Sequence, residues 1–107
     1  MEIKFLYFEG CPSHEDGLAR LKEVMAAEGI DSEIEIIRVD TEAQAQALRF
    51  TGSPTILLNG EDIVPTPEDS YYNLTCRVYW LENGRASPLP SKEMIRQGFR
   101  AVREIEE

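Results

Sequence analysis

The sequence has few cysteines, few basic residues and no long apolar run, and each shortage excludes a class of protein. Two cysteines in 107 residues are too few for a disulfide scaffold. Because 20 Asp and Glu outnumber 11 Lys and Arg, the net charge of −9 opposes binding to nucleic acid or to an anionic membrane. No stretch approaches the roughly 18 apolar residues of a membrane helix, and no secretion signal is recognisable. We therefore expect a cytoplasmic protein with reduced thiols.

The first half of the chain alternates between strand and helix patterns. Apart from Lys4, residues 3–8 are apolar on both alternating faces, which is typical of a central strand. Apolar residues at helical spacing follow over 12–27, and a segment rich in β-branched residues over 33–39 predicts a second strand. Thr41 and Gln44 have the form of a capping box, which predicts that a short helix begins there.

The second half predicts a hairpin, an added segment and a last helix. Asn59-Gly60 between two apolar runs is a strong signal for a tight hairpin, because both residues tolerate positive φ. We then expect a loop over 65–73, an extra strand over 76–81, a turn-like segment over 82–90 and a closing helix over 91–105. The whole order predicts one α/β domain over residues 1–107, with a mixed four-stranded sheet and helices on both faces.

Cys11 is the residue whose position most favours reactivity. It follows Gly10, precedes Pro12 and opens the first helical pattern. Unpaired N–H groups and the helix dipole at such a position favour the thiolate, and they bring a thiol pKa from roughly 8.5 to about 3.5–7.5. Carboxylates at Glu9 and Glu15 act in the opposite direction. The sequence leaves the sign of the net shift open.

Three motifs carry a resemblance to a known family, namely Gly10-Cys11-Pro12, Gly52-Ser53-Pro54-Thr55 and Cys76-Arg77. With the order of elements, they resemble the thioredoxin superfamily, especially its glutaredoxin-like form and small bacterial thioredoxin-like proteins. The resemblance covers the chain up to Val64 and the last helix.

The resemblance implies thiol–disulfide exchange without a cofactor, acting on thiols and disulfides of proteins or small molecules. In this interpretation Cys11 is the attacking thiolate. Pro54 is a cis-proline that faces it, and the backbone of Ser53 pairs with a bound substrate in a strand-like manner. Pro12 and Thr55 complete the predicted substrate site. The alternative for Pro54 is an ordinary trans proline at the start of a strand.

The chain departs from the dithiol pattern of the family, because Cys11 is followed by Pro12, Ser13 and His14 rather than by a second nearby cysteine. Cys76 is the only other thiol. The predicted topology returns the chain toward Cys11 after the hairpin, so the two thiols pair if their Cα atoms come within about 7 Å. The alternative is that Cys76 is a small buried hydrophobic residue.

Two charged or titratable residues have both a functional and a structural interpretation. His14 lies one helical turn after Cys11, where it either stabilises the thiolate and moves a proton or is simply a polar residue of an exposed turn. Arg77 either holds an anionic substrate or supports a thiolate, or it is a solvated charge. Because the residues flanking Cys11 are acidic, glutathione is a weaker expected partner.

Two other classes of function remain open at this point. Cys11, Cys76 and His14 offer ligands for a soft metal ion or a thiophilic compound, although three ligands require an open site or a dimer. A redox-inactive adaptor with the same fold is the other alternative, because a fold does not determine a function.

Overall fold

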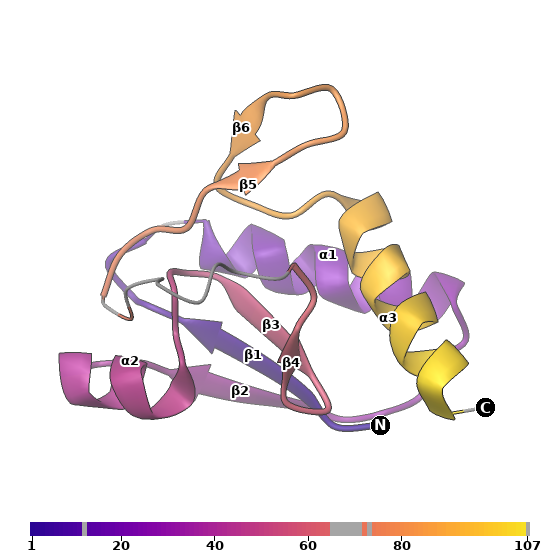
Figure 1. Ribbon diagram of the computed structural model, residues 1–107, viewed down its shortest axis with the longest axis horizontal. Helices are drawn as coiled ribbons and strands as arrows, with labels where there is room; N and C mark the ends of the chain where they lie inside the picture. Colours follow the sequence, from indigo (N-terminus) through magenta and orange to yellow (C-terminus); the bar gives the residue numbers. More distant parts are fainter. Residues whose placement is uncertain (12, 65–71, 73, 107) are drawn as a thin grey trace.

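The computed structural model describes residues 1–11, 13–64, 72 and 74–106, and its main sheet has the strand order β2-β1-β3-β4 (Figure 1). These strands span Ile3–Tyr7 (β1), Ile34–Arg38 (β2), Thr55–Leu58 (β3) and Glu61–Asp62 (β4). β1 pairs with β2 in parallel and with β3 antiparallel, and β3 pairs antiparallel with β4. The predicted mixed four-stranded sheet is therefore confirmed.

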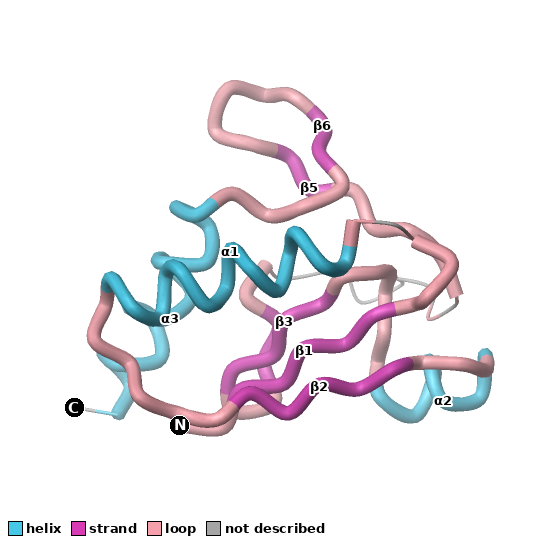
Figure 2. Tube along the Cα trace, turned by 180° about the vertical axis from the view of Figure 1, so that it is seen from behind, coloured by secondary structure: helices cyan, strands magenta, loops and turns pink. Residues whose placement is uncertain are grey.

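The helices cover both faces of this sheet, as Figures 1 and 2 show. α1 (His14–Ala27) and α3 (Lys92–Glu106) lie on one face, and α2 (Glu42–Leu48) lies on the other. Successive strand residues point to opposite faces. In β1, Ile3 and Phe5 accordingly enter the core under α1 and α3, whereas Leu6 enters the core under α2. These three side chains are at most 1% exposed, so both cores exclude solvent at β1.

Two local signals from the sequence are confirmed. Thr41 and Gln44 form the complete capping box at the start of α2. Asn59 and Gly60 have φ values of 52° and 83°, which matches the tight hairpin expected between β3 and β4. The first helix begins at His14, two residues later than the pattern indicated.

The segment before the last helix differs from the prediction. The extra strand expected over 76–81 is only two residues long, Tyr79–Trp80 (β5), and it pairs with Ala86–Ser87 (β6) inside the segment expected to be turn-like. This hairpin projects from the body of the molecule (Figure 1). The extra strand is thus confirmed in part, but its partner, which has only two residues, carried no strand pattern in the sequence.

The strand-like run after the Asn59-Gly60 turn predicts a fourth strand over 61–64, but the strand ends at Asp62. Ile63 packs instead on α3, where a Cβ built on Gly98 would lie 2.8 Å from its side chain. The loop expected over 65–73 lies outside the described residues except for residue 72. None of the helices in the described ranges has both the length and the apolar character needed to cross a bilayer.

Candidate functional site

Cys11 lies in the connection between β1 and α1, at the end of the sheet where the first helix begins. Its backbone N–H donates to the carbonyl of Phe8 at 3.0 Å, which holds the turn. The side chain is only 1% exposed. Its sulfur lies 3.6 Å from the Ser13 hydroxyl and 3.7 Å from the carbonyl oxygen of Ser53. Pro12, the predicted neighbour in the site, lies outside the described residues.

Ser13 occupies the N-cap position of α1 without capping the helix. A serine here normally accepts a hydrogen bond from a backbone N–H of the first turn, but this side chain makes no such bond. Its hydroxyl faces the Cys11 sulfur instead. The first turn therefore keeps its partial positive charge, and the hydroxyl is available to donate to a thiolate.

The second wall of the site is the connection between α2 and β3. The Ser53–Pro54 peptide bond is cis, as the resemblance implied. Gly52 has φ 144°, and a Cβ at this position would lie 2.8 Å from the Cα of Arg77. Only glycine therefore fits where these two segments approach each other. The Thr55 hydroxyl donates to the Gly52 carbonyl at 2.6 Å, which fixes the turn internally rather than offering it to a substrate.

The backbone of Ser53 pairs with the chain's own segment around Cys76. The N–H of Ser53 donates to the carbonyl of Thr75 at 2.8 Å, and the N–H of Arg77 donates to the carbonyl of Ser53 at 3.1 Å. These bonds form a parallel bridge between Ser53 and Cys76. The strand-like pairing that the resemblance implied for a substrate is thus already made within the protein.

This bridge places Cys76 next to the residue whose carbonyl oxygen lies 3.7 Å from the Cys11 sulfur, so the two thiols lie at the same end of the sheet. Burial disfavours the Cys11 thiolate, but hydrogen bonds from Cys76, Ser13 and Ser53 outweigh burial and lower the pKa of Cys11 below its usual value. The hydrogen bond to Cys11, followed by partial burial, raises the pKa of Cys76. The two shifts have opposite directions and favour Cys11 as the thiolate and Cys76 as the thiol. Cys76 is exposed, so its interpretation as a buried hydrophobic residue is wrong.

The Ser53 hydroxyl adds a further donor beside the sulfur. Ser53 is fully buried, and its side-chain oxygen has no conventional hydrogen-bond partner within the described part of the chain. Such unsatisfied groups are rare in folded proteins. The Ser53 side chain also favours ionisation of Cys11 and lowers its pKa.

His14 lies next to Cys11 but contacts its backbone rather than its sulfur. The His14 Nδ1–H donates to the carbonyl of Cys11 at 2.9 Å, and the ring stacks on Tyr7 with centroids 4.4 Å apart. The groups that set the pKa of Cys11 do not include His14. The histidine thus holds the turn that carries the thiol.

Arg77 is neither a solvated charge nor a free anion-binding group. Its side chain is 6% exposed, and its guanidinium donates to Asp62 Oδ2 at 2.6 Å and to the carbonyl of Val64 at 3.0 Å. It also lies over the ring of Tyr79, 4.5 Å from the centroid. Arg77 therefore anchors the segment that carries Cys76 to the end of β4.

Tyr79 fastens the same segment to the cis-proline turn. It is 1% exposed, and its hydroxyl donates to the carbonyl of Pro54 at 2.5 Å. Burial raises the pKa of this hydroxyl, so it remains a protonated donor. The sequence did not identify Ser13 or Asp62 as residues of the site. Ser13 carried a signal, because it lies two residues after the reactive cysteine.

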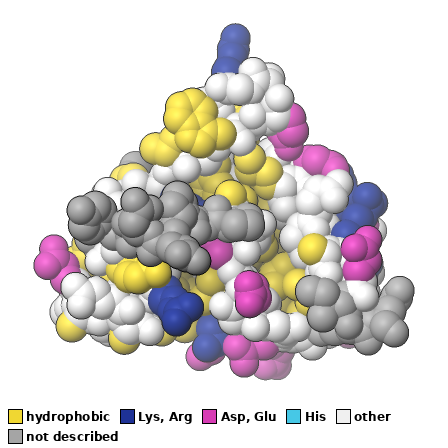
Figure 3. All heavy atoms as spheres, viewed as in Figure 1, with side chains coloured by type: hydrophobic (Ala, Val, Ile, Leu, Met, Phe, Trp, Pro, Cys, Tyr) yellow, Lys and Arg dark blue, Asp and Glu magenta, His cyan; other side chains and the backbone are white. Residues whose placement is uncertain are grey.

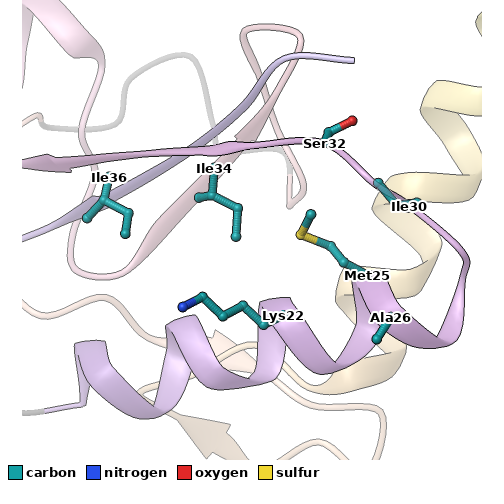
Figure 4. A pocket seen from close by; sticks show the side chains of 7 residues that line it. All are labelled: Lys22, Met25, Ala26, Ile30, Ser32, Ile34 and Ile36. Atoms are coloured by element: carbon teal, nitrogen blue, oxygen red, sulfur yellow. The ribbon is translucent and has the colours of Figure 1, made fainter.

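A hollow of about 410 Å³ between α1 and β2 lies away from this chemistry (Figure 4). Its lining includes Lys22, Met25, Ile34 and Ile36, and contains no thiol, imidazole or carboxylate. Across the described residues, no three His, Cys, Asp or Glu side chains are grouped so that they would hold a metal ion.

Comparison of the chain with family models, curated proteins and solved structures finds no match in any of the three.

Proposed function

We propose that the chain is a thiol–disulfide oxidoreductase whose redox centre is the pair of Cys11 and Cys76. The observation that carries this proposal is that Ser53, whose carbonyl lies 3.7 Å from the Cys11 sulfur, forms a parallel bridge with Cys76. The pKa values of the two thiols are shifted in opposite directions, each by the other thiol among its causes. Two neighbouring thiols of which one ionises more readily are the reduced form of a centre that a disulfide substrate can oxidise.

We also propose that the α/β domain has a thioredoxin-like fold. A parallel pair β1–β2, an antiparallel pair β1–β3 and helices on both faces support it. The position of Cys11 at the start of α1, next to the cis Ser53–Pro54 bond, supports it further. In this protein the second redox cysteine comes from the segment after β4 rather than from the first turn of α1.

The reaction consists of two successive thiol–disulfide exchanges, in which atoms and electrons balance. In the reduced protein, the centre holds one thiolate and one thiol. Oxidation forms a bond between the sulfurs of Cys11 and Cys76 and releases the Cys76 proton. The substrate disulfide takes up the two electrons, and its two sulfurs leave as thiols after protonation. The reverse sequence oxidises a substrate dithiol.

The groups that favour the Cys11 thiolate supply no cation for an anionic substrate such as glutathione. The hydrogen bonds that stabilise the Cys11 thiolate come from neutral groups, Ser13, Ser53 and Cys76. Arg77, the basic residue adjacent to Cys76, is engaged by Asp62 inside the protein. Arg77 is therefore not free to hold an anionic thiol at this site.

Reduction of a peptide disulfide, with dithiothreitol as the terminal reductant, tests the proposal. We expect wild-type protein to accelerate the reaction, whereas Cys11→Ser and Cys76→Ser abolish the acceleration while retaining the wild-type circular dichroism. A lysine variant away from the site, Lys22→Ala, is the control that keeps full activity. If both cysteine variants retain wild-type turnover, the proposal is wrong, and a redox-inactive adaptor becomes the better account.

A further inference from the structure

We propose that Cys76, rather than Cys11, forms the covalent bond with the substrate. We further infer that the substrate is an extended, apolar polypeptide disulfide lying along the outer edge of the Cys76 segment. This inference rests on the proposed function and specifies which thiol meets the substrate and which class of substrate it meets.

Access to the two sulfurs is unequal. Cys11 is 1% exposed, and the carbonyl of Ser53 and the hydroxyl of Ser13 lie next to its sulfur. Cys76 is exposed. Disulfide exchange requires the attacking sulfur to approach along the axis of the bond that breaks, so access decides which thiol reacts. A substrate in solution therefore reaches Cys76 first.

The segment that covers Cys11 is anchored on both sides of Cys76. Its backbone bonds to Ser53 through Thr75 and Arg77, and the Arg77 side chain is tied to Asp62. Exposing Cys11 by lifting this segment would break both backbone bonds and leave the Asp62 carboxylate without its cation. Entry at Cys76 requires none of these losses.

The outer edge of the segment is available for pairing. The bridge to Ser53 uses the carbonyl of Thr75 and the N–H of Arg77, so the N–H and carbonyl of Cys76 point away from Ser53. No group in the described ranges accepts from the Cys76 N–H, and its carbonyl accepts only the Thr75 hydroxyl at 3.4 Å. An extended polypeptide can add to such an edge through its own backbone.

The side chains that alternate with the buried anchors are apolar and exposed. Arg77 and Tyr79 point inward, whereas Val78 and Trp80 are 57% and 66% exposed. Cys76 is exposed as well, so exposed residues alternate with the buried Arg77 and Tyr79 along this segment. Figure 3 shows hydrophobic side chains gathered on the projecting hairpin. A polypeptide substrate with apolar residues beside its cystine would cover Val78 and Trp80. An anionic tripeptide such as glutathione would not cover them.

The exchange then proceeds in two balanced steps. As Cys76 attacks the substrate disulfide R–S–S–R′, its proton passes to the Cys11 thiolate, a Cys76–S–S–R bond forms, and R′S⁻ leaves. Cys11 gives that proton to the leaving thiolate and attacks the Cys76 sulfur. The Cys11–Cys76 disulfide forms and RS⁻ leaves. In the reverse direction Cys11 is a good leaving group, because its thiolate is stabilised.

Trapping of the mixed disulfide tests which thiol enters. The probe is a synthetic peptide dimer joined by one cystine with flanking Val and Leu residues, and the product is located by mass spectrometry. We expect Cys11→Ser and Cys11→Ala to accumulate a mixed disulfide at Cys76. Cys76→Ser, which keeps a side chain of similar size over Cys11, should react at least about tenfold more slowly because its thiol is covered. Equal or faster trapping at Cys11 in Cys76→Ser would overturn the inference.

A second measurement tests the substrate class. We expect Trp80→Ala to lower kcat/KM for the apolar peptide by about tenfold, the effect of losing one well-buried aromatic contact. Turnover of glutathione disulfide should not change. Ile36→Ala, which removes another apolar side chain that is 50% exposed but lies on β2, is the matched control. Equal losses with both substrates would refute the apolar polypeptide assignment.

The two proposals fail in different ways. Absence of a Cys11–Cys76 disulfide in oxidised wild-type protein would refute the proposed function, whatever the variants trap. A reversible disulfide in wild type, together with trapping at Cys11, would refute only the inference about entry at Cys76.

Discussion

Replacing Arg77 by methionine should destabilise the protein more than the loss of any other ion pair in the described part of the chain. The Arg77 guanidinium bonds to Asp62, to the carbonyl of Val64 and, at 3.5 Å, to the Thr55 hydroxyl. Methionine fills much of the same space but leaves the Asp62 carboxylate, 15% exposed, without its partner. Removing one member of a buried pair costs about 3–5 kcal/mol.

The size of the effect follows from the partial exposure of Asp62. Because water still reaches that carboxylate, we expect the lower end of this range, and Arg77→Met should lower the free energy of unfolding by about 3 kcal/mol. The double variant Arg77→Met/Asp62→Leu removes both charges and should recover most of the loss, to within about 1 kcal/mol of wild type. Arg38 pairs with Glu9 and Asp40 but is half exposed. Its methionine variant should cost at most about 1 kcal/mol.

Urea unfolding of the reduced proteins, followed by circular dichroism, measures these differences. Similar losses in Arg77→Met and Arg38→Met would refute the claim that Arg77 is an internal anchor. A double variant as unstable as Arg77→Met alone would show that the uncompensated Asp62 charge is not the cause.

Three further predictions concern the same end of the molecule. Cys76→Ala should raise the pKa of Cys11, because it removes a hydrogen bond that stabilises the thiolate; thiolate absorbance against pH measures this, and an unchanged or lower pKa would contradict it. Tyr79→Phe leaves the carbonyl of Pro54 without its donor and should cost about 1–2 kcal/mol in urea unfolding; an unchanged midpoint would refute this. Gly52→Ala places a Cβ 2.8 Å from the adjacent backbone and should slow formation of the intramolecular disulfide by oxidised dithiothreitol; wild-type kinetics would show that the contact relaxes freely.

The main sheet could be predicted from the sequence because its signals are local. The capping box of Thr41 and Gln44 and the Asn59-Gly60 turn each depend on a few adjacent residues, and both formed as expected. The alternation of apolar residues in β1 likewise matches two cores on opposite faces. The β5–β6 hairpin carried no such signal, since each strand has two residues and pairs outside the main sheet.

The candidate site was predictable only in part. The position of Cys11 at a helix start and the topology that returns the chain toward it indicated where Cys76 would lie. The role of Arg77 was not predictable, because its partner Asp62 lies in another strand and no sequence pattern links them. The burial of Cys11 also depends on Ser53 and on the segment after β4, which meet only in the folded protein.

Equilibration of the wild-type protein across a series of dithiothreitol redox potentials tests the central claim most directly. Rapid alkylation and mass spectrometry then count the free thiols at each potential. We predict one reversible two-electron transition in which both thiols disappear together and Cys11 is joined to Cys76 in a monomeric product. Two thiols that remain free at every potential would contradict the account.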